Sequence, residues 1–112
     1  MAALPVPEQS IADALDRLWV QFLPQMQERV AVMEAANHAL ADGSLTIDQR
    51  GAASAAAHKL AGSLGTFGLT KGTVLAREAE MLFSSESEMN EATLPRLQEI
   101  AGQIRAIIDH RK

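Results

Sequence analysis

The chain contains no cysteine and no tyrosine, and one tryptophan and three phenylalanines are its large aromatic residues. Without cysteine it can form neither a disulfide framework nor a cysteine-ligated zinc site, and it has no thiol nucleophile. Valine, threonine and aromatic residues, which strands favour, are sparse, whereas alanine and straight-chain residues, which helices favour, are abundant. The composition therefore predicts a helical protein of a reducing compartment.

Long apolar runs and an excess of basic charge are also missing. No apolar stretch is long enough to span a bilayer, and no basic segment precedes an apolar run as in a signal peptide. The formal net charge of −4 argues against nucleic acid as the main partner. We therefore expect a cytoplasmic protein without a membrane or nucleic-acid partner, and 112 residues correspond to one domain.

Apolar residues recur at helical spacing from about residue 8 to residue 40. Pro24 lies inside this segment, where it removes a backbone donor and clashes with the preceding turn, so we expect a kink or a short break near Leu23. The segment Thr46–Gln49 has the pattern of a capping box and predicts the start of a second long helix. Gly68 is expected to end that helix.

A third helix should follow Gly68, with Thr70 as its cap. Its expected buried face consists of Val74, Leu75, Leu82 and Met81. The polar, serine-rich residues 84–90 predict a loop. The last helix should begin near residues 91–93, because proline is tolerated in a first helical turn and Pro95 would fall there.

Four amphipathic helices joined by short polar turns bury their apolar stripes most economically in an antiparallel up-down four-helix bundle. The sequence therefore predicts an all-α fold whose first helix is kinked near Pro24. Residues 1–7 are expected to form a flexible tail, with Pro5 and Pro7 keeping it extended, and residues 8–112 a single bundle.

His58 is the candidate functional residue, because its helical face carries almost no other side chains. Residues three, four and seven positions away share that face, and they include Gly51, Ser54, Ala55, Gly62 and Gly65. Glycine costs roughly 1 kcal/mol relative to alanine inside a helix, so two glycines within two turns of His58 need an explanation. Since Leu60 and Leu64 define another face as the core, we interpret the bare face as a surface where a partner approaches the imidazole.

The residues around His58 also resemble a known signature. The segment 57–63 has the sequence Ala-His-Lys-Leu-Ala-Gly-Ser and is closed by Gly65 and Gly68. It is similar to the phosphorylation site of histidine phosphotransfer (HPt) domains in two-component phosphorelays. The stretch Leu69–Glu80 is similar to the helix that follows the phosphohistidine helix in that family.

The resemblance implies a phosphocarrier that accepts a phosphoryl group on His58 and exchanges it with an aspartate of a response-regulator receiver domain. In that family the receiver supplies the aspartate and Mg²⁺, so no cofactor is expected on this chain. A sensor histidine kinase is a further possible partner. The family has no kinase activity of its own, and the chain accordingly shows no Gly-x-x-x-x-Gly-Lys nucleotide loop.

The sequence departs from the family pattern at residue 61. Family members often carry lysine three residues after the histidine, where this chain has Ala61. A phosphate on His58 would then need another cation. An antiparallel third helix places residue 78 level with His58, which makes Arg77 the first choice, followed by Lys59 and by Lys71 nearer the turn.

The expected docking surface for the receiver consists of Gly62, Ser63, Gly65, Ala55 and Ala61 around the His58 ring. No metal site is expected, because Glu34 and His38 form a single pair with ligand spacing and a metal site in a bundle needs several. Two other functions stay open from the sequence. The chain could be a scaffold that dimerises through the small-residue face around Gly62, or the phosphoacceptor domain of a larger histidine kinase.

Overall fold

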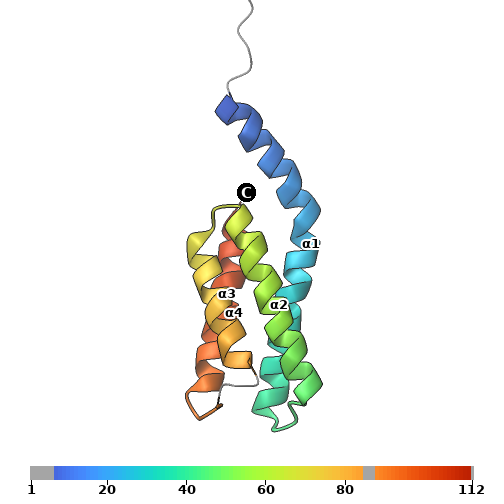
Figure 1. The fold of residues 1–112 in the computed structure, drawn as a ribbon, viewed down its shortest axis with the longest axis vertical. Helices are drawn as coiled ribbons and strands as arrows, with labels where there is room; N and C mark the ends of the chain where they lie inside the picture. The colour runs from blue at the N-terminus through green and yellow to red at the C-terminus, as the bar shows by residue number, and fades with distance from the viewer. Residues whose placement is uncertain (1–6, 85–87, 112) are drawn as a thin grey trace, which may run out of the picture.

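Four helices make up most of the part of the chain that the structure, a computed structural model, describes: residues 7–84 and 88–111 (Figure 1). They are α1 (Pro7–Ala41), α2 (Ile47–Thr66), α3 (Thr70–Phe83) and α4 (Thr93–His110). The described residues include no strand, which confirms the all-α fold. Of the expected tail, residues 1–6 lie outside the described residues and Pro7 already belongs to α1.

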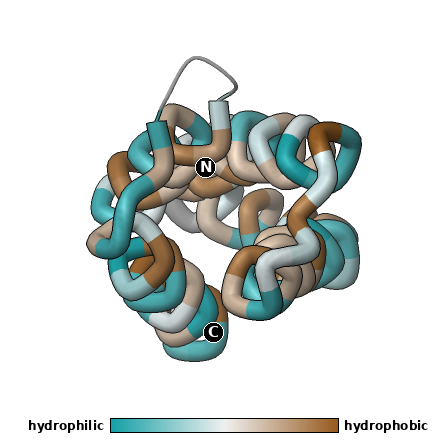
Figure 2. The backbone as a smooth tube through the Cα atoms, turned by 90° about the horizontal axis from the view of Figure 1, so that it is seen from below, coloured by the Kyte–Doolittle hydropathy of each residue, from teal (hydrophilic) through white to brown (hydrophobic). Residues whose placement is uncertain are grey.

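The helices run alternately down and up, and each packs against its neighbours in sequence (Figure 1). The bundle is closed by contacts between α1 and α4. Viewed along the bundle, hydrophilic stretches lie mainly on the outer side of the ring of helices (Figure 2). This is the predicted antiparallel four-helix bundle. In the described part of the chain, no helix has the combination of length and hydropathy that crossing a membrane requires.

The first helix is continuous through Pro24. Its direction changes midway along its length (Figure 1), as expected where a proline removes a backbone donor and crowds the preceding turn. The kink is therefore confirmed and there is no break, so one helix of 35 residues supplies both the bundle wall and a segment that continues beyond it.

Both ends of α2 follow local sequence signals. The Thr46 hydroxyl accepts a hydrogen bond from the Gln49 backbone N–H at 3.0 Å, and the Gln49 side chain accepts one from the Thr46 N–H at 2.8 Å. This is the predicted capping box. At the other end Gly68 adopts a φ of +71°, a left-handed conformation that favours glycine, and Leu69 N–H donates to the Leu64 carbonyl at 3.0 Å.

The expectations for α3 were partly wrong. Residue Leu69 occupies the position before the helix, and no side chain caps it, so Thr70 is not the cap. Val74 and Met81 are 59% and 71% exposed. The residues that α3 does bury are Gly72, Leu75, Ala76, Ala79 and Phe83.

Close packing between α2 and α3 explains why the buried face of α3 differs from the expected one. A Cβ atom added to Gly72 would lie only 3.0 Å from a terminal methyl of Leu64, closer than an ordinary contact. Small residues therefore line this seam, where Ala57 and Ala61 of α2 are buried and Ala76 of α3 is buried too. The expected buried face of α3 was chosen from its large apolar residues, whereas the interface between α2 and α3 requires small ones.

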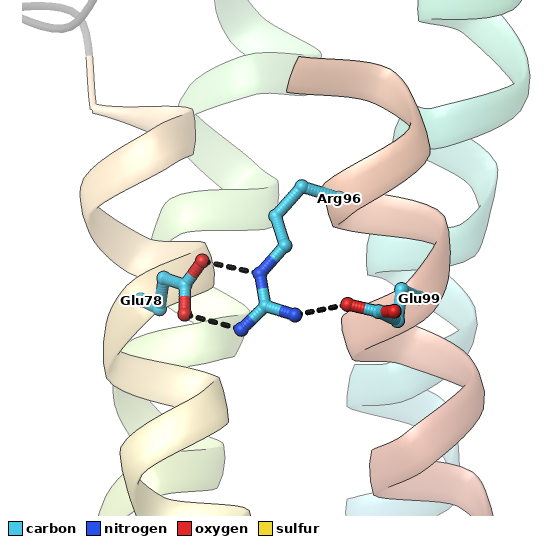
Figure 3. Close-up of polar contacts among 3 residues, drawn as sticks. All are labelled: Glu78, Arg96 and Glu99. Atoms are coloured by element: carbon cyan, nitrogen blue, oxygen red, sulfur yellow. Dashed lines mark hydrogen bonds and ion pairs between the residues drawn. The ribbon is translucent and has the colours of Figure 1, made fainter. Parts of the chain in front are cut away.

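Arginine side chains join helices at the two α4 seams. The Arg96 guanidinium donates hydrogen bonds to both carboxylate oxygens of Glu78, at 2.5 and 2.6 Å, and another to Glu99. Figure 3 shows the three side chains. Hydrogen bonding from Arg96 lowers the pKa of Glu78, despite the opposing effect of partial burial. Between α1 and α4, Arg105 donates hydrogen bonds to both carboxylate oxygens of Glu34, at 2.7 and 3.1 Å.

Candidate functional site

His58 lies near the middle of α2 with its side chain 71% exposed. Leu60 and Leu64 of the same helix are fully buried, so the imidazole and the core occupy different faces. Gly62 is exposed one turn further along, and a Cβ atom added there would meet nothing within 4 Å. Packing within the chain therefore does not require glycine at residue 62, and the expected exposure of His58 beside Gly62 is confirmed.

The His58 ring is held by a carboxylate of α3. Its Nδ1 atom lies 2.9 Å from Oε2 of Glu80, and the Ser54 hydroxyl donates to the backbone carbonyl of Glu80 at 3.2 Å. An ionised carboxylate only accepts hydrogen bonds, so Nδ1 is the donor. In the neutral ring Nε2 then carries no proton. The contact with Glu80 thus leaves Nε2 as the nucleophilic nitrogen.

Glu80 was not predicted as the partner of His58. Counting from the turn placed residue 78 level with the histidine, but Glu78 contacts Arg96 of α4 instead. Helical side chains lean toward the N-terminus of their own helix. Because the helices are antiparallel, the His58 side chain leans away from the turn while the Glu80 side chain leans toward it. Because of these two directions, His58 contacts Glu80, two residues further from the turn than the expected residue 78.

Two open, adjoining hollows flank the His58 ring, with volumes of about 610 and 770 Å³. Arg77 of α3 lines the smaller one and Lys59 of α2 the larger, so both come to the site. Neither forms an ion pair with another described residue. Lys71 lines neither hollow, because it stands nine residues before Glu80, about 13 Å along the helix axis.

The five expected docking residues fall on three different sides of α2. Ala55, Gly62 and Gly65 are exposed on the His58 face. Ser63 faces α1, where its hydroxyl accepts a hydrogen bond from Arg29 at 3.2 Å. Ala61 is buried against α3 and lies in the wall of the smaller hollow. The surface open to a partner is therefore narrower than the expected set.

Glu34 and His38, the one pair on α1 with the spacing of metal ligands, do not lie together with further ligands. Glu34 pairs with Arg105, while His38 is exposed. Within residues 7–84 and 88–111, no group of three or more histidine, aspartate or glutamate side chains is placed to hold a metal ion. The chemistry available at the described site is that of an exposed imidazole oriented by a carboxylate, beside an arginine and a lysine.

Comparisons with known proteins found a matching family and a similar protein. The sequence model of the Hpt domain matches residues 17–110, which include His58, Gly62 and Glu80. Protein RcaC of Microchaete diplosiphon is 30% identical over 96 residues, which cover 86% of this chain and 15% of RcaC. The chain therefore spans a small part of the length of that relative. No solved structure matches the chain.

Proposed function

The chain belongs to the Hpt domain family, whose members are phosphocarriers of phosphorelays, and on that premise we propose that His58 exchanges a phosphoryl group with an aspartate of a response-regulator receiver domain. The observation that carries the proposal is the geometry of His58: an exposed imidazole whose Nδ1 is held by Glu80 and whose surroundings on α2 are bare. A sensor histidine kinase is a second candidate partner.

The proposed reaction begins with the Nε2 lone pair of His58, which points away from the Glu80 contact. As Nε2 attacks the phosphorus of an aspartyl phosphate in line, the N–P bond forms and the bond between phosphorus and the aspartate oxygen breaks. The electron pair leaves with the aspartate as a carboxylate. The imidazole keeps its Nδ1 proton, so the phosphorylated ring carries a positive charge.

Glu80 suits both directions of this exchange. Its carboxylate faces the Nδ1–H, and hydrogen bonds between charged groups are roughly twice as strong as neutral ones. It therefore stabilises the cationic ring that forms when His58 accepts the phosphoryl group. In the return direction the ring leaves as a neutral imidazole with its Nδ1 proton already in place, so no proton transfer is required.

Because Ala61 is uncharged, other residues would have to supply the positive charge near the phosphate. Arg77 and Lys59 line the two hollows, and the planar guanidinium can bind two phosphate oxygens at once. We rank Arg77 first and Lys59 second. The remaining charge would be handled by the receiver, whose own aspartate and Mg²⁺ are needed for the reaction in this family, so the proposal assigns no metal to this chain.

The test uses a purified receiver domain charged with radioactive phosphate in the presence of Mg²⁺. We expect label to move to this chain in an acid-labile, base-stable form and to be absent from His58→Gln. The matched controls are His38→Gln and His110→Gln, which alter the other two histidines and should retain the label. Label that persists in His58→Gln, or never transfers from any receiver tested, contradicts the proposal. The latter outcome would favour the scaffold that dimerises through the Gly62 face.

A further inference from the structure

An exposed methionine borders the His58 site without belonging to the core. Met81 of α3 is 71% exposed, although the sequence predicted it to be buried. Its side chain lines the smaller of the two hollows at His58, together with Gly62 and Arg77. Neither the packing of the bundle nor the phosphoryl chemistry uses this thioether, so an apolar side chain beside the reactive ring needs an explanation.

Both hollows lie over the groove between α2 and α3. Every described residue in their walls belongs to α2, to α3 or to Ser84, which follows α3. The His58 ring leans over the same groove, because its Nδ1 atom contacts Glu80 of α3. A partner whose aspartate approaches Nε2 in line therefore covers the walls of these hollows.

The reach of such a partner follows from the usual size of protein interfaces. A standard interface covers about 800 Å² of each partner, and a round patch of that area extends about 16 Å from its centre. Met81 follows Glu80, which contacts His58, so Met81 lies near the middle of a patch centred on the ring. Ile47 lines the larger hollow and is 86% exposed. It stands eleven residues before His58, about 16 Å along α2, and so lies at the edge of the patch.

The chemistry around Met81 fits the middle of a docking surface. Methionine and arginine are enriched at protein interfaces, and an unbranched thioether adapts to the shape of its partner. Arg77 stands four residues before Met81 on the same face of α3, and Lys59 lines the other hollow. An apolar contact beside these cations complements a partner that presents an aspartyl phosphate.

We propose that Met81 is the central apolar anchor for a receiver domain, which docks over the groove between α2 and α3 with Ile47 at the margin of the same contact. The inference rests on the proposed phosphoryl exchange at His58, and it adds the side of the bundle from which the receiver approaches. Met81 touches no reacting atom in this arrangement. It therefore sets how tightly the receiver binds and leaves the chemical step unchanged.

The first experiment measures the rate of phosphoryl transfer as the concentration of phosphorylated receiver is raised. Met81→Gln keeps the length of the side chain and removes its apolar character. The half-saturating receiver concentration should therefore rise by about tenfold, while the rate at saturation stays the same. Ile47→Gln should raise it by about twofold to threefold, because contacts at the rim of an interface contribute less than those at its centre. Circular dichroism establishes that each variant is folded.

The matched control is Val20→Gln, which changes an apolar side chain that is also 71% exposed. Val20 stands nine residues before Arg29, which contacts Ser63, so it lies about 21 Å along the bundle from His58. Its half-saturating concentration should equal the wild-type value.

A folded Met81→Gln variant that saturates like the wild type overturns the proposal, as does a Val20→Gln variant that weakens binding equally. A lower rate at saturation with unchanged half-saturation would place Met81 in the chemical step and would also overturn it. Failure of the proposed function is a different result, because then no receiver transfers label to the wild-type chain and both proposals fall.

A second experiment locates the receiver through methionine methyl groups labelled with carbon-13. The chain has five methionines, and the Met81 signal is the one that Met81→Gln removes. It should shift when the receiver is added, whereas the signals of Met26 and Met33, which are fully buried in the core, should not. An unchanged Met81 signal would place the receiver on another side of the bundle and contradict the proposal. A shift that grows with the concentration of this chain alone would assign the surface to a second copy, which also contradicts it.

Discussion

Glu78 and Glu80 lie two residues apart on α3, yet they serve different seams of the bundle. Glu78 turns toward α4, where Arg96 binds both of its oxygens and holds its pKa below the usual range (Figure 3). Glu80 turns toward α2, where it contacts the His58 ring through one oxygen. A carboxylate saturated by a guanidinium joins two helices, whereas one facing an exposed imidazole can respond to a change of charge on the ring.

The surfaces beside the two seams differ in the same way. Beside Glu78 the side chains are long and paired, whereas the α2 residues one turn before and after His58 on its face are small: Ser54, Ala55 and Gly62. Since neither Gly62 of α2 nor Gly102 of α4 has any atom within 4 Å of an added Cβ, both tolerate side chains as far as the fold is concerned. Only the first of them adjoins the imidazole. Substituting each of these two glycines therefore distinguishes an effect on folding from an effect on partner docking.

The largest effect is expected for Gly62→Arg. An arginine there should block the approach of a receiver and lower the rate of phosphoryl transfer by more than about 100-fold, while the melting temperature stays the same or rises because arginine favours helix over glycine. The matched control Gly102→Arg should transfer normally. Transfer at the wild-type rate in folded Gly62→Arg would contradict the docking role of this face.

The next largest effect is expected when the two carboxylates are neutralised separately. Glu80→Gln should slow transfer by about tenfold to 100-fold, because the ring loses the charge that stabilises its cationic form. The matched variant Glu78→Gln should lower stability and leave transfer unchanged. Nitrogen NMR of the His58 ring gives an independent measure, since loss of the Glu80 contact should reduce the population of the Nδ1–H tautomer. Equal transfer rates for the two variants would remove the proposed distinction between the seams.

A smaller effect is expected from the cations. Arg77→Ala should raise the rate of phosphohistidine hydrolysis or change receiver transfer by roughly threefold to tenfold, and Lys59→Ala by less, because both side chains are exposed and water screens their charge. Lys71→Ala is the control and should have no effect, since Lys71 lines neither hollow. An effect of Lys71→Ala as large as that of Arg77→Ala would mean that the cations act at long range.

The smallest effect concerns the pH dependence of the Glu78 seam. The pKa of Glu78 is lower in the folded chain than its ordinary value of 4.5, so the pair with Arg96 stabilises the fold fully above that value. The contribution is lost as the pH falls through the folded-state pKa. The difference in unfolding free energy between wild type and Glu78→Gln should therefore be constant near neutral pH and shrink below 4.5. A difference that grows on acidification would contradict the assigned sign.

Local signals in the sequence determined much of this protein. The capping box at Thr46, the left-handed Gly68 and the kink associated with Pro24 each depend on residues that are neighbours in sequence. The exposure of His58 could also be predicted from the sequence, because helical periodicity alone separates its face from that of Leu60. Such features need no knowledge of what packs against the helix.

The tertiary structure decided what depends on a neighbouring helix. Which face α3 buries follows from the close approach of α2, which requires Gly72 and exposes Val74 and Met81. The Glu80 contact with His58 depends on the register of two antiparallel helices and on the direction in which their side chains lean. The first helix continues beyond the bundle because the length of a helix is encoded locally, whereas the length of the bundle is set by its shorter helices.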